Sequence, residues 1–207
     1  MEGFYINLKH RTDRKEHIEK LKEKYPILKN IQRYDAHLDN RYGVGCSISH
    51  IEALKLLLNK DKPYYLILED DFFILNEDNF NSFITDFEKI KDSTEWDVIV
   101  LTPRGTTAKK NHLEKFHRIV EHQTATGYII KDYLIKPLLL LLIEGNKHLC
   151  LGHNPNLWFN DQCWKPLQYK SKFLYYEKIF AGQLPSYSDI EKQFVDYNQR
   201  FLDQVNN

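Results

Sequence analysis

The sequence lacks several features that would each point to a particular class of protein. Its three cysteines, Cys46, Cys150 and Cys163, are an odd number at irregular spacing, which fits neither a disulfide framework nor a CxxC zinc motif. Lys plus Arg equals Asp plus Glu at 29 each, so no excess of positive charge favours binding to nucleic acid or to an anionic membrane. Residues 1–10 contain no apolar core of signal-peptide length, and the most hydrophobic run, residues 138–143, is far shorter than the ~20 residues that span a bilayer. We therefore expect a soluble cytoplasmic protein without a transmembrane segment or a nucleic-acid partner.

The apolar pattern predicts one α/β domain over residues 1–207, because no break in composition divides the chain. Strands that are apolar throughout and alternate with helices predict a mainly parallel central sheet with helices on both faces. Strands are expected at residues 4–8, 64–68, 96–102 and 172–180, with two more within 118–131. Helices are expected at residues 12–25, 51–58 and 79–93, from a start or kink at Pro137, and at 188–205. Residues 104–117, polar and basic without clear periodicity, are expected to form a surface excursion.

One predicted strand ends in a cluster of carboxylates: the segment YYLILEDDF, residues 64–72, runs from apolar residues straight into Glu69, Asp70 and Asp71. Ligands bind at the carboxyl ends of strands in such sheets, and alternation predicts Glu69 and Asp71 on one side and Asp70 on the other. A divalent cation, Mn²⁺ or Mg²⁺, would turn two converging carboxylates into an oxygen site with open positions for substrate phosphates. The alternative is a strand that simply ends in a solvated turn.

Amide and basic side chains follow the first predicted strand, at Asn7, Arg11 and Arg14. They lie where another strand end should meet the acidic one, and arginine is suited to bidentate contact with phosphate. For any one of these residues alone, a solvated helix start is the alternative.

The segment GCSISH, residues 45–50, places Ser47, His50 and free backbone amides at a predicted helix start. Ser49 and Glu52 have the spacing of a capping box, which puts His50 in the first turn of the helix. Helix N-termini bind anions, although simple capping is the alternative. A nucleotide diphosphate bridged by a metal would use this helix start, the arginines and the acidic strand end together.

The order of these segments resembles the family-25 glycosyltransferases, the group that includes bacterial lipooligosaccharide galactosyltransferases and the collagen galactosyltransferase domains. The resemblance spans residues 4–190 and rests on FYINLKHRTDR, YDAHLD, GVGCSISHIEAL, YYLILEDDF, TATGYIIKDYLIKPLL and IFAGQLPSYSDI, which occur in the family's order. One segment departs from the pattern: HNPNLWFNDQCW has Asn156 where the family usually has an Asp, and Asp161 follows five residues later. The resemblance implies a single glycosyltransferase domain of GT-A type. It further implies that galactose or glucose moves with inversion from a UDP-sugar to a glycan or protein-linked hydroxyl, assisted by Mn²⁺ or Mg²⁺.

The resemblance and the patterns above together suggest roles for particular residues. Metal ligands would be Glu69 and Asp71, with His153 or Asp189 as a late ligand. For the general base that inversion requires, Asp161 and Asp189 compete. The donor-binding set would be Asn7, Arg11, Arg14, Ser47, His50, Asp70, Thr124, Thr126 and Tyr128.

Two other functions use the same patterns. Nucleotidyl or phosphoryl transfer would keep the metal and the nucleotide, but the sequence has neither a GxxxxGK[ST] loop nor a kinase-like set of motifs. A catalytically degenerate domain would bind a nucleotide sugar or a partner without turnover, and Asn156 is the only feature that favours it.

Overall fold

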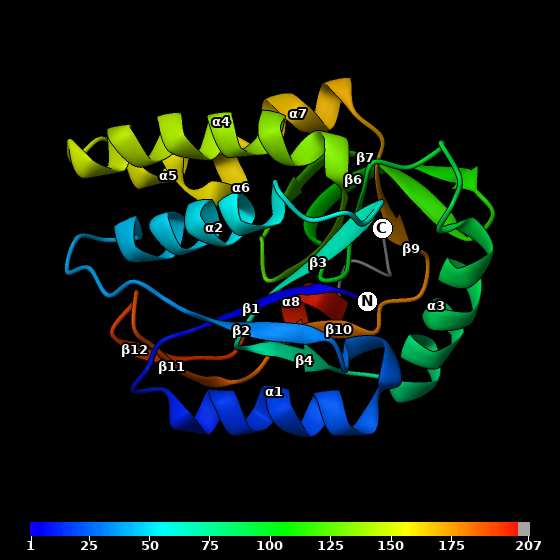
Figure 1. Cartoon of the computed structure of the whole chain (residues 1–207), viewed down its shortest axis with the longest axis horizontal. Coiled ribbons are helices and arrows are strands. Elements are labelled where there is room, and N and C mark those ends of the chain that lie inside the picture. The colour runs from blue at the N-terminus through cyan, green and yellow to red at the C-terminus, as the bar shows by residue number, and fades with distance from the viewer. Residues whose placement is uncertain (203–207) are drawn as a thin grey trace.

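The computed structural model describes the backbone of residues 1–202 and the side chains of residues 1–104 and 112–201. Eight strands form the main sheet, in the order β2–β1–β3–β8–β5–β9–β7–β6 (Figure 1). Their bounds are β1 Gly3–Asn7, β2 Ile31–Asp35, β3 Tyr64–Glu69, β5 Val98–Val100, β6 Arg104–Leu113, β7 Phe116–Gln123, β8 Gly127–Lys131 and β9 Phe173–Tyr176. Two small antiparallel pairs are β4 Phe72–Ile74 with β10 Ala181–Gln183, and β11 Ser186–Ser188 with β12 Gln193–Val195. The helices are α1 Thr12–Lys24, the 3-10 turn Pro26–Leu28, α2 Val44–Leu57, α3 Glu77–Ile90, α4 Asp132–Cys150, α5 Pro155–Trp158, α6 Asn160–Cys163, α7 Lys165–Lys170 and α8 Asn198–Leu202.

Most strands of the main sheet run in one direction, and two are reversed: β8 at its centre and β7 beside the edge strand β6. β1 pairs in parallel with β2 and β3, and β5 pairs in parallel with β9. β8 lies between β3 and β5 and is antiparallel to both. The amino end of β8 therefore lies at the same edge of the sheet as the carboxyl ends of β1 and β3, which brings residues 124–126 to that edge.

Alternation of side chains along the apolar strands produces two core layers, one on each face of the sheet. In β3, Tyr65 and Ile67 pack with residues of α2 and α4, whereas Leu66 and Leu68 pack with residues of α1 and α3. Figure 1 shows α2 and α4 together above the sheet and α1 below it. The predicted α/β fold, with helices on both faces, is confirmed.

The edge of the sheet beyond β9 differs from the sequence-based expectation. Residues 104–117, expected to form a surface excursion, contribute β6 and the start of β7, which pair with each other antiparallel at the edge of the sheet. The strands themselves were not predicted, because backbone hydrogen bonds define this hairpin and its polar sequence has no apolar alternation.

The C-terminal segment also differs from the expectation of a helix over residues 188–205. Residues 186–195 form the β11–β12 hairpin, whose turn holds Lys192 at a positive φ of 56°, and only Asn198–Leu202 is helical. Strand pairing overrides the helical spacing of the apolar residues, so this prediction is wrong. Residues 203–205 of the predicted helix lie outside the described residues. Pro137 lies inside α4, which begins at Asp132.

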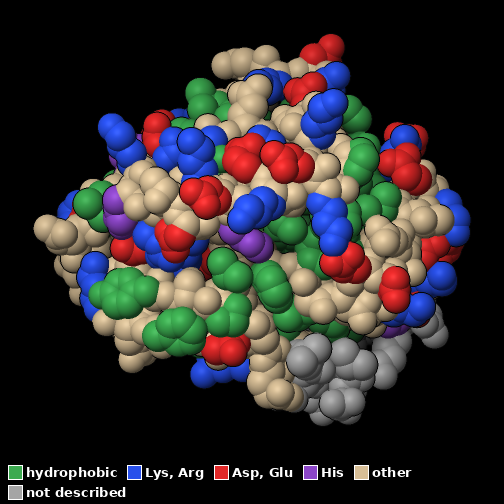
Figure 2. Space-filling model, turned by 90° about the horizontal axis from the view of Figure 1, so that it is seen from below, with side chains coloured by type: hydrophobic (Ala, Val, Ile, Leu, Met, Phe, Trp, Pro, Cys, Tyr) green, Lys and Arg blue, Asp and Glu red, His purple; other side chains and the backbone are tan. Residues whose placement is uncertain are grey.

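The surface carries charges of both signs. Figure 2 shows Lys and Arg side chains interspersed with Asp and Glu over the face seen from below. Of the helices within residues 1–202, none is both long enough and apolar enough to cross a bilayer.

One close approach between helices holds α6 against the long helix α4. Gly145 of α4 is buried, and a Cβ atom at this position would lie 2.1 Å from Cys163 Sγ and 3.0 Å from the Trp158 carbonyl oxygen. We expect Gly145→Ala to lower the free energy of unfolding by about 1–3 kcal/mol, the usual cost of overpacking. Urea denaturation measures this change.

The double variant Gly145→Ala/Cys163→Ala is the matched control, because it removes the sulfur that the new methyl group would meet. It should be more stable than Gly145→Ala alone. A double variant that is no more stable would show that the contact does not limit packing here.

Candidate functional site

A cavity of about 630 Å³ opens at the edge where β1 and β3 end and β8 begins. One wall comes from the acidic end of β3, residues 124–126 before β8, and the start of α2. Residues 156 and 159–162 and the β11–β12 hairpin region also line the cavity. Residues far apart in the chain therefore enclose a space large enough for a small-molecule ligand.

The structure divides the predicted site residues into two groups. Those that line the cavity are Arg14, Glu69, Asp70, Asp71, Thr124, Thr126, Asp161 and Asp189. Those that do not line it are Asn7, Arg11, Ser47, His50, Tyr128 and His153.

Arg14 holds the acidic strand end to the C-terminal hairpin. Its Nη1 donates to Asp70 Oδ1 at 2.8 Å and lies 3.3 Å from Asp71 Oδ2. Its Nη2 donates to Ser186 Oγ at 2.7 Å and to the Tyr187 carbonyl oxygen at 3.2 Å. The guanidinium thus contacts two adjacent carboxylates and ties the hairpin to them.

Asp70 holds neighbouring side chains in place through hydrogen bonds at both of its carboxylate oxygens. Asn7 Nδ2 donates to Asp70 Oδ2 at 2.7 Å, so both carboxylate oxygens of Asp70 have partners. Burial raises the pKa of Asp70, although the Arg14 guanidinium and the Asn7 amide oppose this rise. Asn7 does not line the cavity, but it holds Asp70, which does.

Asp71 differs from Asp70 in having an oxygen without a partner. Oδ1 of Asp71 is buried and accepts no hydrogen bond from the described residues, and the side chain is 14% exposed. Burial raises the pKa of Asp71 from 3.8 to about 7; Arg14 opposes the rise, and Glu69 and Asp70 add to it. A divalent cation bound by oxygen ligands would satisfy this orphaned carboxylate oxygen, so the residue fits the metal that the sequence predicts.

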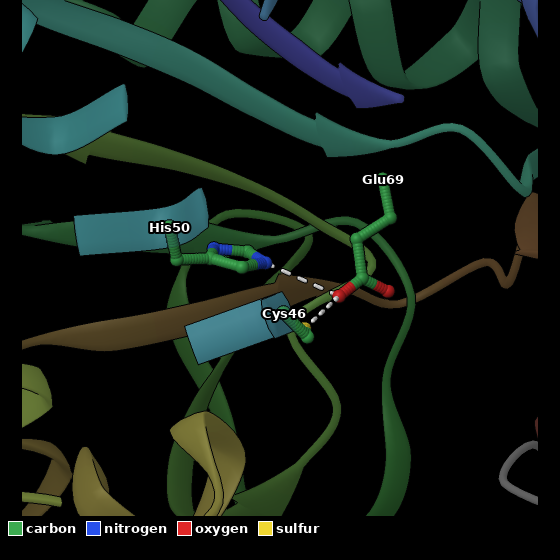
Figure 3. A group of neighbouring side chains, drawn as sticks. All are labelled: Cys46, His50 and Glu69. Carbon is green, nitrogen blue, oxygen red and sulfur yellow. Dashed lines mark hydrogen bonds and ion pairs between the residues drawn. The ribbon is translucent and has the colours of Figure 1, made fainter. Parts of the chain in front are cut away.

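Glu69 faces a different set of partners. Its Oε1 lies 3.2 Å from His50 Nε2 and 3.7 Å from Cys46 Sγ (Figure 3). Its Oε2 accepts a hydrogen bond from Thr126 Oγ1 at 3.1 Å. Burial by itself would raise the pKa of Glu69, but the hydrogen bonds from His50, Thr126 and Cys46 outweigh it and lower the pKa. β3 ends at Glu69, so the strand alternation that predicted Glu69 and Asp71 on one face does not extend to Asp71.

The helix behind this cluster begins earlier than the capping-box pattern predicts. α2 starts at Val44, with Gly43 as N-cap at φ 75°, and Ser49 Oγ donates to the Gly45 carbonyl oxygen inside the helix. His50 therefore lies in the second turn, and its predicted place in the first turn is wrong. Ser47 is buried, and its Oγ has no hydrogen-bond partner among the described residues. Gly43, Gly45 and Cys46 at the start of α2 line the cavity.

Arg11 and Asp189 form an ion pair. Arg11 Nη1 donates to Asp189 Oδ2 at 2.7 Å, and Arg11 also donates to both oxygens of Asp13. Burial by itself would raise the pKa of Asp189, but hydrogen bonds from Arg11 and His10 outweigh it and lower the pKa. An acidic, ion-paired carboxylate is a poor proton acceptor.

The remaining predicted residues fall into different surroundings. Thr124 and Thr126 line the cavity and bond to each other, with 3.1 Å between the hydroxyl oxygens. Tyr128 is a buried core aromatic whose hydroxyl lies 3.4 Å from His50 Nδ1. His153 is exposed after the end of α4, where its Nδ1 lies 2.7 Å from His148 Nδ1.

Asp161 lies on α6 and lines the cavity. Burial raises the pKa of Asp161, and the hydrogen bond from Gln162 and the nearby Arg104 and Lys165 only partly oppose the rise. Of the two candidate bases, Asp161 is the one with a raised pKa and is therefore the better proton acceptor. Asn156, at the position where the sequence pattern departs from its family, lines the same cavity.

Several residues that line the cavity could not be predicted from the sequence. Arg104 lines the cavity at the start of β6, with its guanidinium carbon 4.9 Å from the centre of the Tyr197 ring. No ion pair joins Arg104 to a carboxylate among the residues whose side chains are described. Tyr42 and Phe159 line the cavity with their ring centres 5.1 Å apart. Only the folded chain brings these residues together.

Comparisons with known proteins support the fold. No protein-family model and no curated protein matches the sequence. A glycosyltransferase involved in the glycosylation of the major capsid of PBCV-1 matches with a TM-score of 0.52 at 9% identity, over 98% of this chain and 90% of that one. A UDP-glucose pyrophosphorylase complexed with UDP-glucose matches with a TM-score of 0.51 at 10% identity, over 99% of this chain and 79% of that one. The GT-A-like α/β fold predicted from the sequence is confirmed, and the family-25 resemblance stays a prediction.

The raised pKa of Asp71 predicts a specific dependence of stability on pH. Between its usual pKa of 3.8 and the folded value of about 7, the folded protein binds more protons at this site than the unfolded chain does. The contribution of Asp71 to stability is therefore present at low pH and is lost as the pH rises through this interval. We expect Asp71→Asn to gain stability relative to the wild type between about pH 4.5 and about pH 7.5.

Chemical denaturation at both pH values measures this difference. Asp61→Asn, at an exposed position before β3, is the control for the loss of one carboxylate. If the difference in stability between the wild type and Asp71→Asn stayed constant with pH, this would contradict the raised pKa of Asp71.

Proposed function

We propose that this chain is an inverting glycosyltransferase that moves galactose or glucose from a UDP-sugar to a hydroxyl group of a glycan or protein-linked acceptor. The observation that carries the proposal is the cavity edge at Asp71. There a buried carboxylate oxygen without a partner lies beside Arg14, at the strand end where sheets of this kind bind ligands. The family-25 resemblance of the surrounding motifs supports the same reaction.

The donor diphosphate would lie against the edge formed by β3 and the start of α2. Backbone amides near Gly43 and Gly45 carry the positive end of the helix dipole toward the cavity. Arg104 adds a cation that no described carboxylate neutralises. Asp71 would hold Mn²⁺ or Mg²⁺, which when bound neutralises charge on a departing diphosphate. Arg14 and Asn7 fix Asp70 and thereby orient the turn that carries Asp71.

The acceptor hydroxyl needs a base on the opposite side of the sugar, and we assign this role to Asp161. It lines the same cavity as the acidic strand end, and burial raises its pKa. Asp189 is the weaker choice because Arg11 and His10 hold it as an anion. The proposal covers both acceptor classes of the family-25 enzymes, bacterial surface glycans, as in lipopolysaccharide biosynthesis, and hydroxylysine of collagen-like proteins.

Turnover of UDP-sugars with and without Mn²⁺ tests the proposed reaction. We expect UDP to be released from UDP-galactose or UDP-glucose in the presence of Mn²⁺, and release to be lost with EDTA or in Asp71→Ala. Asp61→Ala, an exposed carboxylate variant, should behave as the wild type does.

Other outcomes point to the competing functions. Formation of UTP and a sugar 1-phosphate from UDP-sugar and pyrophosphate would indicate nucleotidyl transfer, as in the pyrophosphorylase of similar fold. Tight binding of UDP without release under any acceptor would indicate a degenerate binding domain. Equal binding of UDP with and without EDTA, unaffected by Asp71→Ala, would contradict the metal assignment.

The two candidate bases predict different kinetic results. We expect Asp161→Asn to reduce kcat by about 10²- to 10⁴-fold, the usual contribution of a general base, while the affinity for the donor is retained. Asp189→Asn should leave the pH dependence of kcat unchanged, because Asp189 is paired with Arg11. Steady-state kinetics against pH measure both, and the reverse pattern would assign the base to Asp189.

A further inference from the structure

Three side chains of different chemistry point toward one another behind the cavity wall. Cys46 and His50 are one turn apart on α2, and both face the carboxylate of Glu69 at the end of β3 (Figure 3). Their ligand atoms all lie within 4.8 Å of one another. Cys46 and Glu69 line the cavity, and His50 is buried behind them. The reaction proposed above uses none of the three directly.

We propose that Cys46, His50 and Glu69 form a Zn²⁺ site, separate from the Asp71 carboxylate and independent of the proposed transferase activity. Tetrahedral zinc with sulfur, nitrogen and oxygen ligands needs ligand atoms about 3.4–3.6 Å apart, as follows from its usual bond lengths. The structure places Glu69 Oε1 3.2 Å from His50 Nε2 and 3.7 Å from Cys46 Sγ. Two of the three ligand pairs are therefore already close to the spacing that the ion requires, and the third pair, Cys46 with His50, lies within 4.8 Å.

Each proposed ligand also has a partner outside the cluster. His50 Nδ1 lies 3.4 Å from the Tyr128 hydroxyl, Asn160 Nδ2 donates to Cys46 Sγ at 3.7 Å, and Thr126 Oγ1 donates to Glu69 Oε2 at 3.1 Å. Metal ligands are commonly oriented by such outer contacts, which fix the imidazole tautomer and support the sulfur and carboxylate. A buried imidazole thus meets a partly exposed thiol and carboxylate, and each of the three has a further hydrogen-bond partner.

The choice of metal follows from the ligand types. A thiolate with an imidazole selects zinc over Mg²⁺ or Mn²⁺, which prefer oxygen ligands. On binding, the Cys46 thiol loses its proton to solvent, and zinc replaces that proton between sulfur and carboxylate. Three protein ligands leave a fourth position, which is open to the cavity because Cys46 and Glu69 line it.

Metal analysis of the full chain tests the site without any substrate. After treatment with a chelator and dialysis, zinc titration against a chromophoric competitor should give one tight equivalent per chain. Substitution with Co²⁺ should give a thiolate-to-cobalt charge-transfer band. Both signals should be lost in Cys46→Ser, and His50→Gln and Glu69→Gln should weaken zinc binding at least tenfold.

Matched variants separate this site from other thiols and from the Asp71 position. Cys150→Ser and Asp71→Asn should keep the zinc equivalent and the cobalt band. Zinc should raise the unfolding temperature of the wild type and not that of Cys46→Ser, whose fold is checked by circular dichroism. Absence of a tight zinc equivalent in the wild type, or a cobalt band that survives in Cys46→Ser, would overturn the proposal and leave the cluster as a hydrogen-bond network.

Discussion

The geometry of the cavity depends on the contacts that the Arg14 guanidinium makes. It contacts two consecutive carboxylates, Asp70 and Asp71, and it also holds Ser186 and Tyr187 of the C-terminal hairpin. Two carboxylates this close, largely buried and without a cation, would repel each other and destabilise the folded state. One side chain therefore permits the acidic turn and also attaches the wall that encloses it.

The three acidic residues at the end of β3 have different structural surroundings because each meets different neighbours. Glu69 accepts hydrogen bonds from α2 and from Thr126, Asp70 is held by Asn7 and Arg14, and Asp71 keeps an oxygen without a partner among the described residues. Their environments shift the pKa of Glu69 down and those of Asp70 and Asp71 up. Consecutive residues of one charge type thus provide a hydrogen-bonded anchor, a structural ion pair and a carboxylate with one oxygen left unbonded by the described residues.

Patterns among neighbouring residues in the sequence were enough to predict several strands and helices. The apolar run before Glu69 gave β3, the spacing of Phe80, Phe83 and Phe87 gave α3, and both layers of the sheet followed from uninterrupted apolar strands. The start of α2 was missed because the spacing of Ser49 and Glu52 mimics a cap, whereas Gly43 adopts the left-handed conformation that begins the helix. Arg104 and the meeting of Cys46 with Glu69 could not be predicted, since they depend on contacts between distant segments. The cavity's acidic edge was therefore predictable, whereas the approach of Arg104 and of the α2 start to it was not.

The contacts of Arg14 also determine the order in which this site can assemble. Arg14 and Asp70 are 56 residues apart in the chain, whereas Arg14 and Ser186 are 172 residues apart. Contacts of long sequence separation form late, and a chain that folds as it is synthesised makes its earlier segments first. The sheet edge with its carboxylates can therefore exist well before the hairpin reaches it. Until the hairpin docks, those carboxylates face water, so the enclosed, partly dehydrated site appears in a single late step of folding.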